Sequence, residues 1–188
     1  MTEISIPKPE LPKTKRANDH IGKKYLALRN QLWPDISDGD LWLRTEQDGF
    51  TTIPRTMPLI AEIINGMSKG KPAFSTYFDL WCRAFDQCFV LLNKKPEMAF
   101  YAGFKAERAE QTWKTRMVIL AELGFIRIKG GSNGDLSYAL ILNPHKVIQD
   151  HHKRKTPTLT ENHYLSLLAR GVEIGAKDIG DVKPKPTN

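Results

Sequence analysis

Three polar residues at intervals of three, Arg108, Gln111 and Lys114, carry donors and acceptors that match those of nucleic-acid bases and phosphates. An arginine guanidinium can donate to O6 and N7 of guanine, and a glutamine amide can pair with N6 and N7 of adenine. A lysine ammonium can neutralise a phosphate. On a helix that turns about 100° per residue, these three side chains and Thr115 would lie on one side.

An apolar stripe indicates the helix that would present this polar side. Its members recur at spacings of three and four: Ala106, Ala109, Trp113, Met117 and Leu120. The stripe predicts a helix over 105–123 that is anchored in a core and ends at Gly124. An exposed amphipathic helix with solvated charges is the alternative, and it is favoured by the neighbouring Glu107 and Glu110.

The segment that follows has the pattern of a β-hairpin. Residues 125–129 alternate as a strand does, the GGSNG run at 130–134 is a strong turn signal, and residues 136–142 form the return strand. Arg127 and Lys129 flank the turn. A glycine-rich tip lets a backbone approach phosphates or enter a minor groove, although a tight turn is expected whatever the function.

Two helices are expected before the helix at 105–123. Aromatic and other apolar residues predict a central core helix over 75–92, and a short helix over 96–101 is separated from the helix at 105–123 by a turn at 102–104 that contains glycine. Cys82 and Cys88 fall within the central helix, so we interpret both as small core residues. Two cysteines indicate no disulfide framework.

The flanking segments complete the organisation. Helices are expected at 19–32, 56–66, 144–152 and 162–170, around a polar loop at 35–52. We divide the chain into a disordered basic arm at 1–17, a domain with an N-terminal helical extension at 18–153, and a C-terminal helix with a flexible tail at 154–188. Core packing is expected for the helix at 56–66, whereas the last helix could pack on the core or on a second subunit.

The run AELGFIRIKGGSNGDLSYALILNP resembles the helix-to-wing junction of winged helix-turn-helix proteins, among them bacterial transcription regulators and plasmid replication initiators. The resemblance covers about residues 75–148. It implies a mainly α fold with a small β-hairpin wing (α+β), with extra flanking helices around it. It also implies double-stranded DNA as the partner, frequent homodimerisation, and a role in transcription or in replication of a plasmid or other mobile element.

These arguments select one set of DNA-binding candidates. Arg108 and Gln111 are expected to read bases because the first turns of such a helix enter the groove, and Lys105 and Lys114 are expected to contact phosphates. The full set is Lys105, Arg108, Gln111, Thr112, Lys114, Thr115, Arg127, Lys129, Ser132 and Asn133.

The distribution of charge agrees with a polyanionic partner. The net charge is +7, and the segment 94–116 has six basic and three acidic residues whereas 35–92 has five and eight. The chain contains no apolar run of the roughly 18–20 residues that span a bilayer, and its first residues lack the apolar core of a secretory signal. We therefore expect a cytoplasmic protein without a membrane partner.

Other functions receive little support from the sequence. His145, His151 and His152 lack cysteine or carboxylate partners at ligand spacing, so no metal site is expected. No phosphate-binding glycine loop, nucleophile elbow or zinc-protease motif occurs, and we expect neither catalytic residues, a cofactor nor a small-molecule substrate. A winged-helix module that binds another protein remains the alternative, ahead of an RNA binder.

Overall fold

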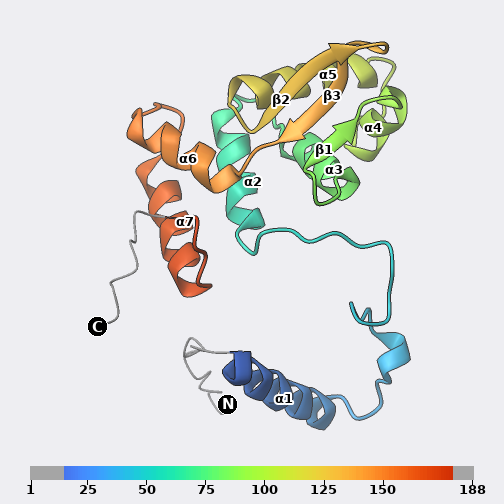
Figure 1. Ribbon diagram of the computed structural model, residues 1–188, viewed down its shortest axis with the longest axis vertical. Helices are drawn as coiled ribbons and strands as arrows, with labels where there is room; N and C mark the ends of the chain where they lie inside the picture. Colours follow the sequence, from blue (N-terminus) through green and yellow to red (C-terminus); the bar gives the residue numbers. More distant parts are fainter. Residues whose placement is uncertain (1–14, 180–188) are drawn as a thin grey trace. The chain divides into compact units, whose positions relative to one another are not determined.

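The computed structural model describes residues 15–179, with side chains described from residue 22 onward. It divides into two compact units, Met1–Phe50 and Thr51–Asn188 (Figure 1). The first unit contains α1 (Lys15–Leu32) and the 3-10 helix η1 (Asp38–Asp40). Of the predicted arm at 1–17, residues 1–14 lie outside the described residues, and the last three begin α1.

The second unit combines helices with one small sheet. Its elements, in chain order, are α2 (Met57–Met67), α3 (Phe74–Arg83), β1 (Phe89–Leu91), α4 (Lys95–Tyr101), α5 (Ala109–Glu122), β2 (Ile126–Gly131), β3 (Gly134–Ile141), α6 (Pro144–Lys153) and α7 (Glu161–Glu173). This arrangement confirms the predicted α+β class. Among the described residues, no helix is both long and apolar enough to span a membrane.

The sheet has three antiparallel strands in the order β1-β3-β2. The β2–β3 hairpin was predicted, but its strands are longer than expected and leave only Ser132 and Asn133 at the tip. Gly131 pairs with Gly134, and the register shifts between Lys129 and Gly131. The three glycines expected in the turn therefore all lie in the strands.

The prediction of one helix over 75–92 is wrong, because α3 ends at Arg83 and β1 follows. Next to the paired residues of β1 and β3, further backbone bonds attach this segment to the hairpin: Ile141 N–H donates to the Cys88 carbonyl, and Leu92 N–H donates to the Ser137 carbonyl. The three residues of β1 are all apolar, so their sequence fits a buried helix segment as well as a short strand, and in the sheet their burial alternates. The free edge of β3 decides between the two, since pairing satisfies backbone groups of both strands.

Several residues that were expected in the core are exposed. Phe85 and Phe89 are 84% and 43% exposed, and both cysteines are exposed and free. Cys88 has a φ of 54°, in the left-handed region, where the chain turns into β1. The interpretation of the cysteines as core residues is therefore wrong.

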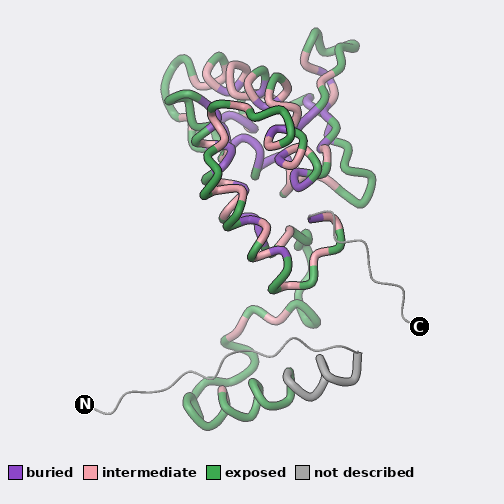
Figure 2. Tube along the Cα trace, turned by 90° about the vertical axis from the view of Figure 1, so that its left-hand side faces the viewer, coloured by how far each residue is buried: buried purple, intermediate pink, exposed green. Residues whose placement is uncertain are grey.

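The core of the second unit lies between the helices and the inner face of the sheet. Figure 2 shows the buried residues gathered in this unit, whereas the described part of the first unit is largely exposed. Three predicted members of the α5 stripe, Trp113, Met117 and Leu120, are fully buried. Ile60, Ile63 and Ile64 of α2 are also buried, which confirms the expected packing of that helix.

The helix predicted over 105–123 starts later than expected, since α5 begins at Ala109. The predicted start at Lys105 is therefore wrong. The Phe104 N–H donates to the Ala99 carbonyl and the Ala109 N–H to the Ala106 carbonyl, so residues 102–108 form a longer turn than expected. Gly103 has a φ of 91° in this turn. Ala106 is exposed rather than in the core, and none of residues 105–108 has a buried side chain that would hold it in a helix.

Part of the expected flexible tail instead packs on the core, whereas its residues 180–188 lie outside the described residues. Ile179 is 5% exposed, and its side chain lies so close to Gly171 of α7 that a Cβ there would come within 2.7 Å of it. The Asp178 carboxylate lies 2.7 Å from Asn143 Nδ2 and 3.0 Å from His145 Nδ1. Partial burial raises the pKa of Asp178, but the hydrogen bonds from Asn143 and His145 outweigh it and leave the pKa below its usual value.

The buried indole of Trp113 gives the first testable prediction. Trp113→Ala removes the largest fully buried side chain, so the free energy of unfolding should fall by about 3–5 kcal/mol. Val118→Ala on the same helix is the control, because Val118 is 45% exposed and its removal should change stability by less than about 0.5 kcal/mol. Urea denaturation followed by circular dichroism measures both, and equal effects would contradict the described core.

The contacts of Asp178 predict a pH dependence. A carboxyl group with a lowered folded pKa contributes stability above its unfolded pKa and loses that contribution as the pH falls through its folded pKa. The stability difference between the parent chain and Asp178→Asn should therefore shrink below about pH 4. Denaturant midpoints measured across this range provide the test, and a difference that widens on acidification would argue against the bond.

Candidate nucleic-acid interface

The first turns of α5 present a polar surface. Gln111 is exposed, Thr112 and Thr115 are half-buried, and the Thr115 hydroxyl donates to the Gln111 carbonyl at 3.0 Å. Lys114 Nζ lies 2.6 Å from Glu110 Oε1 in an exposed i,i+4 pair. Because such pairs contribute at most about 0.5 kcal/mol, Lys114 can exchange this carboxylate for a phosphate at little cost.

Arg108 and Lys105 lie in the turn before α5 rather than within it. Arg108 occupies the N-cap position, and both side chains are exposed. Neither forms an ion pair with the residues described here. Their positive charges lie beside the N-terminal end of α5, where the helix dipole also favours an anion.

Arg116 has a positioning role that the sequence did not indicate. Its Nε donates to the Pro72 carbonyl at 2.9 Å, and its guanidinium lies over the Phe104 ring, with 5.9 Å between the guanidinium carbon and the ring centroid. These contacts attach α5 to the segment before α3 and to the turn that precedes α5. Arg116 is therefore occupied on the protein, in contrast to Arg108.

Arg83 connects α3 with α4. Its guanidinium lies 2.8 Å from Asp79 and 3.6 Å from Glu97, and it lies over the Tyr101 ring at 5.4 Å. Burial raises the pKa of Asp79, even though the hydrogen bond from Arg83 acts in the opposite direction. The cluster fixes α4, which in turn packs on α5 and sets the direction of the polar surface.

The hairpin tip is attached to α4. Lys95 Nζ donates to the Asn133 carbonyl at 2.6 Å, and within the tip the Ser137 hydroxyl donates to the Gly134 carbonyl and accepts from the Asn133 N–H. Ser132 and Asn133 are exposed. The sequence did not single out Lys95, and only its position opposite the folded hairpin reveals this contact.

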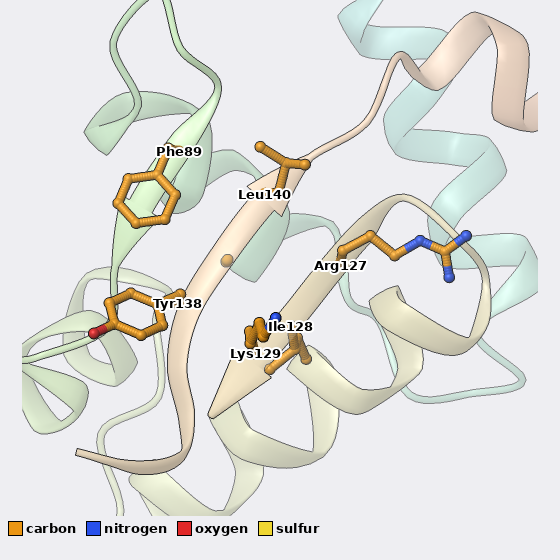
Figure 3. A pocket seen from close by; sticks show the side chains of 7 residues that line it. Phe89, Arg127, Ile128, Lys129, Tyr138 and Leu140 are labelled. Atoms are coloured by element: carbon orange, nitrogen blue, oxygen red, sulfur yellow. The ribbon is translucent and has the colours of Figure 1, made fainter. Parts of the chain in front are cut away.

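Arg127 and Lys129 belong to a different surface. Alternation along β2 places them opposite the core-facing Ile126 and Ile128. The strand register brings them together with four side chains of β1 and β3, and we call this set the outer sheet face. It consists of Phe89, Leu91, Arg127, Lys129, Tyr138 and Leu140. Figure 3 shows all of these except Leu91.

The predicted site residues thus form two groups. The turn before α5 and the exposed side of α5 carry Lys105, Arg108, Gln111, Thr112, Lys114 and Thr115. The outer sheet face carries Arg127 and Lys129, on the side of the sheet away from the core in which α5 is anchored. Ser132 and Asn133 lie at the end of the hairpin, next to α4. Only the first group and the tip can belong to one footprint around α5.

The three histidines considered as metal ligands are occupied by protein groups. His145 Nε2 lies 2.6 Å from the Thr56 hydroxyl, and His151 Nε2 lies 2.7 Å from the Leu123 carbonyl. His152 stacks on Tyr164 with 3.6 Å between the ring centroids. Within the part of the chain that the structure describes, no group of three or more metal-ligating side chains comes together.

The contact of Lys95 gives a prediction for the hairpin tip. Lys95→Met removes the donor to the Asn133 carbonyl but retains the aliphatic stem, so the tip amides should exchange with deuterium faster. Global stability should change by less than about 1 kcal/mol, since the bond is exposed. Hydrogen exchange measured by NMR tests this, with Lys94→Met as the control, and unchanged protection of the tip would show that the bond does not hold the hairpin.

Comparisons of this chain with protein-family models, curated proteins and solved structures found no match. The functional proposal therefore rests on the geometry of the chain itself.

Proposed function

We propose that the second unit is a winged helix-turn-helix that binds double-stranded DNA in a sequence-specific manner. The observation that carries the proposal is the order α3-β1-α4-α5-β2-β3, in which the polar side of α5 is exposed and a hairpin follows directly. In helix-turn-helix proteins the second helix of the motif enters the major groove. Here α4 is the first helix, and α5 is the recognition helix.

The residues around the start of α5 would read the duplex. The N-terminal end of a recognition helix lies deepest in the groove, so Arg108 at the cap and Gln111 in the first turn have the best positions for base edges. Lys105 and Lys114 would contact phosphates on either side. The hairpin tip, Ser132 and Asn133, would approach the backbone or the adjacent minor groove.

A sequence-specific binder of this size fits the control of transcription or the initiation of replication on a plasmid or other mobile element. Recognition of an inverted repeat requires two copies of the chain. On α7, Leu167 is buried against the core, whereas Leu165 and Val172 are 50% and 55% exposed. These two side chains are available for a second copy while the helix remains packed on its own unit.

A second candidate function is a winged-helix module that binds another protein. Exposed aromatic residues on α4 favour it, since Phe100 and Tyr101 are 57% and 64% exposed. Aromatic side chains are enriched in the centres of protein interfaces. The two functions differ in their response to salt, because only contacts with phosphates release condensed counterions.

The proposal predicts a graded loss of DNA binding among α5 variants. Duplexes selected from a random pool by the parent chain provide the ligand, and fluorescence anisotropy gives the affinity. Arg108→Ala should weaken binding to the selected site by about 1–3 kcal/mol and relax the base preference at one position. Lys114→Ala should weaken binding to all duplexes about equally and reduce the slope of log affinity against log salt by about 1.

Arg170→Ala is the matched control. It removes the same charge from α7, where Arg170 pairs with Glu173, at the other end of the second unit from α5 (Figure 1). Its effect on affinity should be small. Absence of any duplex binding, or equal losses for Arg108→Ala and Arg170→Ala, would rule out α5 as the recognition helix and leave the protein-interaction function.

A further inference from the structure

The outer sheet face, defined above by its six residues, is not used in the proposed footprint of α5. It combines exposed apolar side chains with two cations: Phe89, Leu91 and Leu140 are 43%, 55% and 41% exposed, and Arg127 and Lys129 lie beside them on β2. Solvent-accessible aromatic groups on a sheet lower the solubility of a protein unless something covers them. The chemistry of this face therefore points to a ligand of its own.

The two aromatic rings form a flat platform. Phe89 and Tyr138 are diagonal neighbours on β1 and β3, their ring centroids are 5.8 Å apart, and their planes differ by 23°. Figure 3 shows the rings beside each other with their faces turned in the same direction. The shallow hollow over this face is lined by Phe89, Tyr138, Leu140 and the two cations of β2. Flat π systems are the natural occupants of such a platform.

The strand register fixes where the two cations lie relative to the aromatic rings. In the strand register, Lys129 pairs with Tyr138 and Arg127 pairs with Leu140, which in turn pairs with Phe89. Each cross-strand row thus begins with an apolar residue on β1 and ends with a cation on β2. None of the six side chains is acidic, and neither cation forms an ion pair within the described part of the chain.

The combination of aromatic rings and unpaired cations favours one class of ligand over the others. An apolar peptide or a second copy of the face would bury two cations without anions to pair with them, which is costly. Two copies would also bring like charges together. An unpaired nucleic-acid strand satisfies both parts of the face, because its bases stack on aromatic rings and its phosphates neutralise neighbouring cations. A duplex does not, since its bases are stacked on one another and present only their edges.

We propose that the outer sheet face binds unpaired nucleotides, with bases stacked on Phe89 and Tyr138 and the sugar-phosphate backbone along Arg127 and Lys129. The site is separate from α5, so one unit could hold a duplex on one side and a displaced single strand on the other. Binding here does not require the proposed duplex recognition to be correct, since the two surfaces share no residue.

The test uses the full chain and labelled oligonucleotides of about ten nucleotides, oligothymidylate as the DNA arm and oligouridylate as the RNA arm. Phe89→Ala and Tyr138→Ala should each lower the affinity for the single strand about tenfold or more, and Arg127→Ala should reduce its salt dependence. Phe89→Tyr retains a ring and should retain binding. The arm with the higher affinity identifies the sugar.

Crosslinking gives a second readout that does not depend on affinity. An oligonucleotide carrying 5-iodouracil should crosslink on irradiation to Phe89 or Tyr138, as identified by mass spectrometry of the digested chain. Arg108→Ala is the control, because it should weaken duplex binding and leave the crosslink unchanged. Circular dichroism and denaturation establish that each variant is folded, and Arg127→Ala tests the site even if Tyr138→Ala unfolds the sheet.

Three results would overturn the proposal. The first is that neither oligonucleotide binds. The second is that Phe89→Ala and Arg127→Ala bind the single strand as well as the parent chain does. The third is that Arg108→Ala removes single-strand binding as strongly as Phe89→Ala does, which would place the strand on α5. If Arg108→Ala loses duplex binding but retains single-strand binding, the two surfaces act independently, and each proposal can then be judged without the other.

Discussion

The pairing of β3 on both of its edges is the constraint on which the second unit depends. Its backbone bonds to β1 hold the end of α3 and the start of α4, and its bonds to β2 form the hairpin that follows α5. Side chains alternate along these strands, so one face closes the core over Trp113 while the other faces outward. The same pairing therefore anchors α5 and creates a second surface on the opposite side of the sheet.

The positions of the proposed DNA-binding side chains follow from where the core attaches α5. Buried Trp113, Met117 and Leu120 fix the rotation of the helix, and Arg116 attaches it to the Pro72 carbonyl. The polar residues are left on the exposed side, with Gln111 in the first turn. On the sheet, the register rather than the chain order decides the neighbours, and it brings Phe89 of β1 next to Tyr138 of β3.

The two proposed surfaces differ in the form of nucleic acid that each would bind. Around α5 the groups are hydrogen-bonding and charged, as groove recognition requires, whereas the outer sheet face presents flat rings beside cations. A protein that acts where a duplex opens would need both. A protein that only regulates transcription would need the first, and the second would then serve another partner.

The sequence by itself determined those helices whose capping residues and apolar spacing allow only one interpretation. Asn143 and Thr160 cap α6 and α7 as their types predict, α2 buries its isoleucines, and the stripe around Trp113 faces the core. Only the tertiary structure decided the rest. The run around Phe89 fits a helix or a strand by its own pattern and became a strand because β3 offered a free edge. Arg127 and Lys129 were grouped with α5 because they flank the glycine-rich turn of the expected wing, but strand alternation, which acts on the folded sheet, placed them on the side of the sheet away from the core.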